Sequence, residues 1–467
     1  MITKRNLLKT IIPTIFPLCI FAQNKDASIA NAIELTINQN EPGIKISNDF
    51  PGFSYEAGLL ASSPDYLNEN NTKLIRMIKN LGNGILRIGG NSSDITHWRE
   101  HDKYTSPGKD SSLFKSDIDI FSKFAKATGW KVIFGLNLGD NNIDAAINEA
   151  KYVNNKLENE VYVYQIGNEP DLYYKWLRPK TYDSTGFLKD WNTYYISLKA
   201  ALPSMKFAGP DVSHSIEWVD YFAANTGKNI SLLDAHYYRK LGNHTATKWD
   251  YILNKDTLLN DYLNNLNETS GALSIPYRIS ECNSVSRGGK EGVSDVFASA
   301  LWGLDFMWTV AEHNGQGVNF HGGTHSYYAP IVLKDGKPTP RPLYYAMLAF
   351  KYASENSKII PLTINKTDNS NFSAFASTND KNTYITLINK ENKAKTFSIG
   401  IGGKASNYKV ASLGAPSPTA LEGITFGNNA VQDDGSFQLG NLQTFPVKGN
   451  KFSIEVPAMS ASIIFVR

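Results

Sequence analysis

Residues 161–171 are Val-Tyr-Val-Tyr-Gln-Ile-Gly-Asn-Glu-Pro-Asp, an apolar run that ends abruptly in polar residues. A short apolar run bounded by Gly and Pro is typical of a strand buried on both faces of a parallel sheet. In barrels built from such strands, functional side chains lie at the C-terminal strand ends. Asn168 and Glu169 therefore fall where a site is expected.

Seven further apolar runs extend this pattern, so that it covers the chain from about Phe50 to about Ser354. The eight expected strands are Gly52–Glu56, Gly84–Gly89, Lys131–Asn137, Val161–Gly167, Lys206–Gly209, Leu232–Tyr238, Tyr277–Cys282 and Gly317–His321. Helical patterns lie between them, for example at Asn71–Leu81, Ile118–Thr128, Trp191–Leu202 and Val293–Glu312. This α/β order predicts a (β/α)8 TIM barrel over residues 50–354, since such barrels typically take about 250 residues. A doubly wound open sheet is the alternative, but no Gly-rich nucleotide loop follows any strand.

The last part of the chain has a different period. Beyond Lys358, apolar and polar residues alternate, as in Thr383–Ile388 and Phe452–Val456, and Gly, Asn and Pro clusters separate the runs. This pattern predicts an antiparallel β-sandwich domain over residues 355–467. Ile33–Ile37 and Ile44–Ile46 alternate in the same way, so we expect the N-terminal strands of residues 23–49 to join the sandwich.

The charge of the chain comes from its N-terminus. Lys and Arg number 47 against 44 Asp and Glu, but residues 1–22 hold Lys4, Arg5 and Lys9 and no acid. Without that segment the charges balance, which argues against a nucleic-acid partner or binding to a membrane surface. Aromatic residues make up 12%, which suits polar ligands with apolar faces.

Residues 1–22 are predicted to be a secretory signal peptide cleaved after Ala22. Basic residues precede the apolar stretch Ile11–Ala22, which is too short to span a bilayer. The expected location is therefore periplasmic or extracellular. After cleavage Cys282 is the one remaining cysteine, so no internal disulfide is expected.

A second strand ends in a glutamate, in Tyr277-Arg278-Ile279-Ser280-Glu281-Cys282-Asn283. Glu169 and Glu281 would end strands four and seven, on opposite sides of the barrel mouth. Two carboxyl groups facing one pocket push their pKa values apart, which leaves one as an acid and the other ionised. Glycoside hydrolysis needs that pair. The alternative is that each glutamate forms a structural salt bridge at its strand end.

The motifs around both glutamates resemble those of retaining (β/α)8 glycoside hydrolases, through Gly167-Asn168-Glu169-Pro170 and Ser280-Glu281-Cys282-Asn283-Ser284. Three further stretches are similar to glycoside hydrolase family 79, which contains β-glucuronidases and heparanases: Leu86–Ser92, Gly292–Asp295 with Ala300–Trp302, and Gly317–Gly323. The resemblance implies that Glu169 is the acid/base and Glu281 the nucleophile. It also implies that Asn168 donates to the sugar 2-hydroxyl.

Further polar residues at strand ends are candidates for substrate binding. Alternation puts His236 and Tyr238 on one face of the sixth strand, where the Tyr238 hydroxyl could hold Glu281 ionised; the alternative is a barrel aromatic. Glu56 ends the first strand and either binds sugar hydroxyls or pairs with Arg87. Asn91 has the same two possible roles.

The resemblance also implies a pocket for a substrate carboxylate. In family β-glucuronidases, tyrosines and backbone N–H groups of a Gly-rich loop hold that group, and the matching residues here are Gly288, Gly289 and Tyr328. Ser286 stands where the family has a second tyrosine, which weakens the glucuronate prediction. Arg287 and Lys290 could supply charge, or could simply be solvated.

No cofactor is expected, and no metal site. His321 and His325 are four residues apart but lie in a Gly-rich loop without nearby acids. The sequence therefore predicts a retaining exo-β-glycosidase acting on a carbohydrate, specifically a β-glucuronidase. One alternative is an endo-acting, heparanase-like hydrolase, which should need a long basic cleft. The others are a retaining β-glycosidase of a neutral sugar and a carbohydrate-binding protein without activity.

Overall fold

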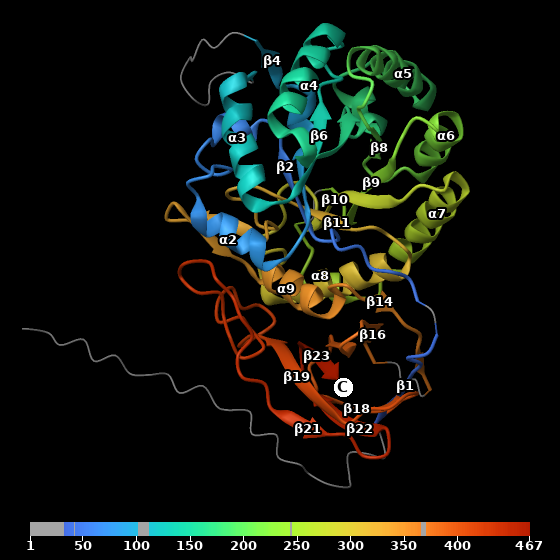
Figure 1. Cartoon of the computed structure of the whole chain (residues 1–467), viewed down its shortest axis with the longest axis vertical. Coiled ribbons are helices and arrows are strands. Elements are labelled where there is room, and N and C mark those ends of the chain that lie inside the picture. Colours follow the sequence, from blue (N-terminus) through green and yellow to red (C-terminus); the bar gives the residue numbers. More distant parts are fainter. Residues whose placement is uncertain (1–31, 42, 101–111, 243–244, 366–369) are drawn as a thin grey trace, which may run out of the picture.

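The computed structural model describes residues 32–41, 43–100, 112–242, 245–365 and 370–467, so the signal peptide predicted at residues 1–22 lies outside the described residues. Eight parallel strands form a barrel surrounded by helices (Figure 1). They are β2 (Gly52–Glu56), β3 (Ile85–Gly89), β6 (Lys131–Leu136), β7 (Val161–Ile166), β8 (Ala208–Val212), β9 (Leu232–Lys240), β10 (Tyr277–Val285) and β11 (Val318–Gly322). The Tyr164 amide closes the barrel by donating to the Lys206 carbonyl (2.9 Å). The predicted (β/α)8 fold is confirmed.

Helices follow most of the strands and cover the outside of the barrel. They are α1 (Leu59–Ser62), α2 (Thr72–Asn80), α3 (Lys115–Thr128), α4 (Ile143–Leu157), α5 (Ser184–Ala201), α6 (Ile216–Thr226), α7 (Thr257–Leu273), α8 (Phe297–Glu312) and α9 (Pro342–Ser354). Short elements complete this part: β4 (His97–Arg99), β5 (Ser112–Phe114), β12 (Ile331–Lys334), β13 (Lys337–Pro340), and the 3-10 turns η2 (Asn91–Asp94), η3 (Glu158–Glu160), η4 (Pro170–Lys175) and η5 (Trp249–Leu253). Among the described residues, no helix combines the length and apolar character needed to cross a membrane.

The barrel interior is layered, and the layers place the site. Ile85, Ile133, Val163, Ala208 and Leu232 form an apolar layer near the N-terminal strand ends. Because side chains two residues apart on a strand share a face, the next layer contains Arg87, Gln165 and Asp234, all fully buried. Buried polar groups are costly unless they are hydrogen-bonded. The polar layer therefore indicates a network that supports the groups above it.

The C-terminal part is a pair of packed sheets. One has the order β15-β1-β18-β22 and the other β14-β16-β17-β23-β19-β20, with β21 beside β19. Their bounds are β1 (Ile33–Ile37), β14 (Lys358–Ile359), β15 (Leu362–Ile364), β16 (Phe372–Thr378), β17 (Thr383–Asn389), β18 (Lys395–Ile401), β19 (Asn407–Gly414), β20 (Thr425–Phe426), β21 (Thr444–Pro446), β22 (Lys451–Val456) and β23 (Ser460–Val466). The sheet that contains β16, β17, β19, β20 and β23 packs against α9 at the side of the barrel (Figure 1), and Trp308 of α8 stacks on Phe375 of β16.

Several predicted elements differ in detail from the structure. β1 lies between β15 and β18 and is parallel to β18, so this sheet is not purely antiparallel. The strand predicted at Ile44–Ile46 is absent. Lys45 makes one isolated bridge to Lys358, because the neighbouring strand β14 is only two residues long and cannot pair with a longer segment. α3 and α5 begin earlier than predicted, since Asp117 accepts the Phe114 amide (2.9 Å) and Asp183 accepts the Gly186 amide (2.9 Å).

Candidate active site

Glu169 and Glu281 face each other at the C-terminal mouth of the barrel. Glu169 follows β7 with a left-handed backbone (φ 48°), and Glu281 lies within β10. One carboxylate oxygen of each lies within 4.8 Å of the other and of a ring nitrogen of His236. Double displacement at a sugar uses carboxyl groups about 5–5.5 Å apart, whereas direct attack by water uses about 6.5–9.5 Å. The observed spacing fits double displacement.

Glu281 lies among groups that favour its charged form. Its Oε2 accepts a hydrogen bond from Arg87 (2.7 Å), and its Oε1 accepts one from the Tyr238 hydroxyl (2.7 Å). His321 Nδ1 lies 3.3 Å from the same Oε2. Burial alone would raise the pKa of Glu281, but the positive charges of His321, His236 and Arg87 hold it well below its usual range. An ionised carboxylate in this position can act as a nucleophile.

Glu169 has the opposite pKa shift. Burial raises the pKa of Glu169 and the charge of Glu281 adds to the rise, although His236 favours the ionised form. The Glu169 Oε1 atom lies 3.1 Å from His236 Nδ1. A carboxyl group with a raised pKa keeps its proton at higher pH and can donate it to a leaving oxygen. The mouth therefore holds one carboxyl suited to each of the two roles.

Arg87 connects the floor of the site to Glu281 and to Asn168, the residue before Glu169. It is fully buried, and besides Glu281 it donates to Asp211 (2.6 Å) and Asn168 (2.8 Å). Its remaining N–H groups bind Gln165 (2.8 Å) and Ser54 (2.9 Å). The ion pair with Glu56 suggested as an alternative from the sequence is absent, because these partners occupy the guanidinium.

The other predicted residues at strand ends lie around this core. Asn168 accepts from Arg87 and donates from Nδ2 to Asn91 (3.1 Å). Asp94 lies behind them and accepts from the Asn168 amide (3.0 Å) and from the Tyr173 hydroxyl (2.7 Å). Asp94 therefore holds the loop in place, and burial raises its pKa to about 6.

Glu56 lies at the edge of the site. Its Oε2 accepts from the Ser92 amide (2.7 Å), and its Oε1 lies 3.4 Å from His321 Nε2. A Cβ at Gly90, where φ is 73°, would lie 2.5 Å from the Glu56 carboxylate. The second Gly of the Gly-Gly pair thus leaves room for this side chain.

The loop after β10 borders a cavity of about 360 Å³. Gly288, Tyr328, Glu56 and His321 are among its lining residues. Gly289 has φ 85°, and a Cβ there would lie 2.7 Å from the Tyr328 amide, so the loop needs glycine. Asn283 of β10 donates to the Tyr328 carbonyl (3.1 Å) and so ties the loop after β11, which carries Tyr328, to β10.

Ser286 and Lys290 have structural partners in the same loop. The Ser286 hydroxyl accepts from the Gly242 amide (3.0 Å), and Ser286 is not among the residues that line the cavity. Lys290 donates to the carbonyls of Thr245 (2.6 Å) and Thr247 (2.7 Å). It therefore ties the loop after β10 to the loop after β9 and is not simply solvated.

We expect Tyr238→Phe to lower kcat about 10- to 150-fold, because a hydrogen bond to a charged group contributes about 1.5–3 kcal/mol. Loss of this bond raises the pKa of Glu281, so the acidic limb of the pH profile moves to higher pH. Tyr237→Phe is the matched control, since the Tyr237 hydroxyl donates to Asp256 (2.6 Å). Equal kinetics for the two variants would show that Tyr238 does not act on Glu281.

Glu169, His236 and Glu281 could also be considered as ligands of a metal cation, because one ligand atom of each lies within 4.8 Å of the others. Both Glu281 oxygens already accept hydrogen bonds, and the Arg87 guanidinium supplies positive charge beside them. We therefore assign these atoms to hydrogen bonding.

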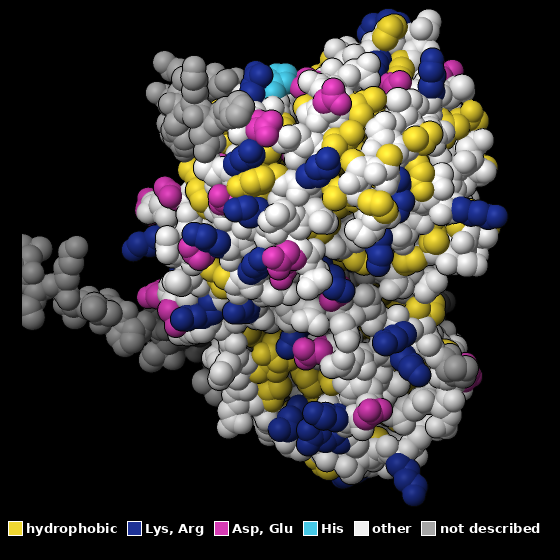
Figure 2. All heavy atoms as spheres, turned by 45° about the horizontal axis from the view of Figure 1, so that its top comes forward, with side chains coloured by type: hydrophobic (Ala, Val, Ile, Leu, Met, Phe, Trp, Pro, Cys, Tyr) yellow, Lys and Arg dark blue, Asp and Glu magenta, His cyan; other side chains and the backbone are white. Residues whose placement is uncertain are grey.

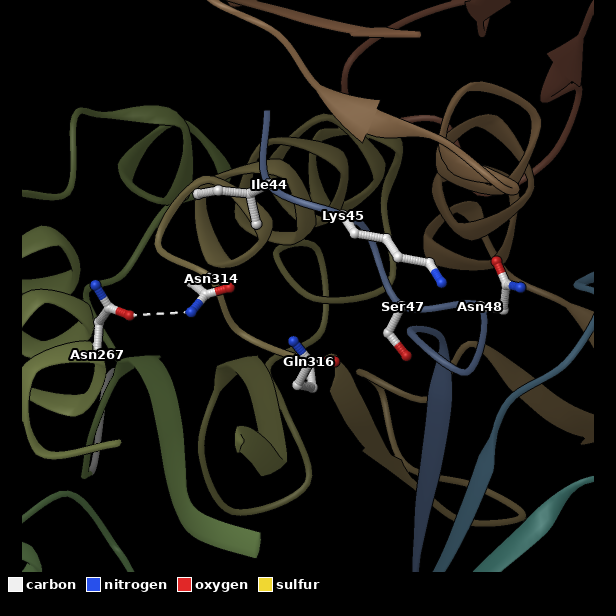
Figure 3. Close-up of a pocket in the computed structure, with 7 residues that line it drawn as sticks. All are labelled: Ile44, Lys45, Ser47, Asn48, Asn267, Asn314 and Gln316. Atoms are coloured by element: carbon white, nitrogen blue, oxygen red, sulfur yellow. Dashed lines mark hydrogen bonds between the residues drawn. The ribbon is translucent and has the colours of Figure 1, made fainter. Parts of the chain in front are cut away.

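A larger hollow of about 670 Å³ lies away from this chemistry (Figure 3). Its lining includes Ser47 and Asn48, which precede β2, and Gln316, which precedes β11. It thus lies toward the N-terminal strand ends, where residues of such barrels usually serve stability and not catalysis. In it Asn314 donates to Asn267 (3.4 Å) (Figure 3), and none of the described residues that line it carries a carboxylate or an imidazole.

Sequence reasoning missed three residues of the network. The sequence prediction includes Arg87 only as a possible partner of Glu56, although a charged residue between Leu86 and Ile88 in a buried strand itself indicates a buried polar network. Asp211 was missed because the fifth strand was expected to end at Gly209, whereas β8 continues to Val212. The spacing of His321 and His325 raises only the question of a metal, whereas the structure places His321 beside Glu281.

The sequence is similar to those of two fungal β-glucuronidases and of mammalian heparanases. It is 24% identical to "Beta-glucuronidase" of Neurospora crassa over 69% of this chain and 66% of that protein. It is 25% identical to "Beta-glucuronidase" of Aspergillus niger over 62% of this chain and 61% of that protein. With "Heparanase" of Rattus norvegicus it shares 26% over 54% of this chain and 48% of that protein. The chain therefore spans less than two thirds of each of these three relatives, and no protein-family model matches it.

Solved structures share the fold. A 4-O-α-L-rhamnosyl-β-D-glucuronidase from Fusarium oxysporum matches with a TM-score of 0.76 and 17% identity, over 93% of this chain and 100% of that one. A GH51 arabinofuranosidase from Xanthomonas axonopodis pv. citri matches with a TM-score of 0.69 and 16% identity, over 94% and 100%. These structures show the shared fold, and the sequence matches confirm the resemblance to glycoside hydrolase family 79 inferred from the motifs.

Proposed function

We propose that this chain, a homologue of the β-glucuronidases and heparanases of glycoside hydrolase family 79, is a retaining exo-β-glucuronidase. The observation that carries the proposal is the pair of carboxyl groups at the barrel mouth. Their oxygens lie within 4.8 Å of each other, and their pKa values shift in opposite directions. Spacing and ionisation together match what double displacement needs.

In the first step, Glu281 attacks the anomeric carbon while Glu169 gives its proton to the leaving glycosidic oxygen. This forms a glycosyl–enzyme ester and frees the aglycone. In the second step, the Glu169 carboxylate takes a proton from water, whose oxygen attacks the same carbon and releases Glu281. Asn168 donates to the sugar 2-hydroxyl, a bond that strengthens in the transition state. Arg87 and Tyr238 keep Glu281 ionised between turnovers.

The cavity beside the loop after β10 supports a uronate substrate. Tyr328 and the backbone of Gly288 line it, as the resemblance implies for a carboxylate pocket. His321 also lines it, and burial opposes its charge while the carboxylates of Glu281 and Glu56 raise its pKa. Because Ser286 points to Gly242 and not into this cavity, we assign the carboxylate to Tyr328 and to the loop amides, including that of Gly289.

The charge distribution favours exo action over endo cleavage of an acidic chain. On the face of the barrel seen in Figure 2, Lys and Arg side chains are interspersed with Asp and Glu, and the described residues that line the active-site cavity include no Lys or Arg. A protein that binds a long polyanion needs a field of one sign along its cleft.

We also propose that residues 1–22 direct export of the protein to the periplasm or the extracellular space.

The test compares aryl β-glucuronide and aryl β-glucoside hydrolysis by residues 23–467. We expect kcat/KM to be at least about 10-fold higher for the glucuronide, because hydrogen bonds to a charged carboxylate contribute about 1.5–3 kcal/mol. Tyr328→Phe should narrow that ratio. Preference for the glucoside would contradict the uronate assignment and support a neutral-sugar glycosidase. Ligand binding without turnover of either substrate would favour a carbohydrate-binding protein.

A further inference from the structure

Another buried carboxylate, Asp211, lies beneath the two catalytic candidates. It is 1% exposed. Four donors surround it: besides Arg87 and His236, they are Gln165 (2.5 Å) and the Ser280 hydroxyl (2.8 Å). Burial opposes its charge, but Arg87 and His236 lower the pKa of Asp211, so it is ionised.

The two oxygens of Asp211 lead to different glutamates. Oδ1 accepts from His236 Nε2 (2.8 Å), and the other ring nitrogen of His236 faces Glu169 at 3.1 Å. Oδ2 accepts from Arg87 Nη2 (2.6 Å), and Arg87 Nη1 donates to Glu281 at 2.7 Å. One side chain is therefore a single intermediary away from each catalytic carboxyl.

We propose that Asp211 is a positioning residue that acts on both catalytic carboxyl groups at once, on Glu169 through His236 and on Glu281 through Arg87. This inference rests on the proposed function for the roles of the two glutamates. The geometry of the network itself is independent of the substrate.

The first arm of the network, from Asp211 through His236 to Glu169, sets the pH at which Glu169 loses its proton. Each nitrogen of His236 faces a carboxylate, so Glu169 and His236 together hold a proton that the Asp211 anion stabilises. Glu281 from β10 and Asp171 from η4 also favour proton retention near Glu169. Asp234 and Arg87 face Asp211 itself. Removal of the Asp211 charge should let the pair lose its proton at lower pH.

The second arm fixes the direction of Arg87. A guanidinium is a planar fork, and a carboxylate on one side of the fork holds the other side toward its second partner. Without Asp211 the fork can tilt away from Glu281. The main-chain carbonyl of Asp211 accepts the Glu169 amide (2.9 Å), and Asp211→Asn keeps that bond. This substitution therefore tests the side chain alone.

Leaving-group dependence separates the two arms. We compare Asp211→Asn and His236→Gln on phenyl β-glucuronide and on 2,4-dinitrophenyl β-glucuronide, whose departure needs no acid. His236→Gln should lose about 10²-fold on the phenyl substrate and much less on the dinitrophenyl one. Asp211→Asn should lose activity on both, because it also disturbs the nucleophile.

The pH readout uses kinetics and NMR together. In Asp211→Asn the alkaline limb of kcat/KM should move to lower pH, and the ¹⁵N signals of His236, assigned with His236→Gln, should titrate at lower pH than in the parent protein. Asp305→Asn is the control: it removes a carboxylate paired with Lys390 (2.8 Å) in contact with the sandwich, and both readouts should stay unchanged.

The inference fails if Asp211→Asn keeps the parent alkaline limb and the parent His236 titration. It also fails if the variant loses activity on the phenyl substrate alone, since Arg87 would then not carry its effect. A shifted His236 titration in a protein that hydrolyses no glucuronide would support the Asp211–His236 arm while contradicting the proposed function. The two failures are therefore distinguishable.

Discussion

Glu281→Gln should lower glucuronide hydrolysis by about 10⁴-fold or more, the scale seen when a catalytic group is removed from a covalent mechanism. The amide has nearly the same shape but cannot form the glycosyl ester. Its neutral side chain also leaves Arg87 and Tyr238 facing a group that no longer carries the charge they stabilise. The measurement is kcat on the most reactive aryl glucuronide.

Glu149→Gln is the matched control for this substitution. Glu149 is a buried carboxyl on α4, and burial raises its pKa to about 8, so the side chain is largely uncharged near neutral pH. Its replacement should leave kcat within about 2-fold, as substitutions outside the reacting groups usually do. A Glu281→Gln protein with more than a tenth of the parent activity would rule out Glu281 as the nucleophile.

Arg87→Met should destabilise the fold by about 3–5 kcal/mol, because loss of one partner from a buried ion pair leaves uncompensated charge. Here two carboxylates, Asp211 and Glu281, would lose the same cation. The measurement is the urea midpoint at neutral pH. Arg76→Met, which removes an exposed pair with Asp434, should leave the midpoint nearly unchanged.

The stability difference should also depend on pH. The folded pKa of Glu281 is lowered, so the pairing stabilises the fold above the unfolded pKa and the contribution is lost as pH falls through the folded value. The gap between Arg87→Met and the parent should therefore narrow in acid. A gap that is small at neutral pH would contradict the account of Arg87 as the cation that holds the site together.

The barrel could be predicted from the sequence because each of its strands has a recognisable pattern within a few consecutive residues. Val161–Ile166 and Tyr277–Cys282 are apolar runs that end in polar residues, and that signal survives without knowledge of the partners. The helix starts at Lys115 and Ser184 were missed because they depend on caps by Asp117 and Asp183, which are single hydrogen bonds.

The hydrogen bond from Tyr238 to Glu281 could also be expected, since it needs only strand order and alternation. The Arg87–Asp211 pair could not, because it joins strands two and five across the barrel interior, 124 residues apart. Ile44–Ile46 alternates between apolar and polar residues as a strand does, but its neighbour β14 has only two residues and is too short to pair with it. Long-range contacts of this kind are set by packing and not by local pattern.

Proton NMR of the first turnovers on an aryl β-glucuronide tests the central claim, double displacement by Glu169 and Glu281, most directly. The account predicts that the β-anomer of the released sugar appears first and that the α-anomer follows at the rate of mutarotation. Initial release of the α-anomer would mean single displacement by water, and Glu281 would then not be the nucleophile.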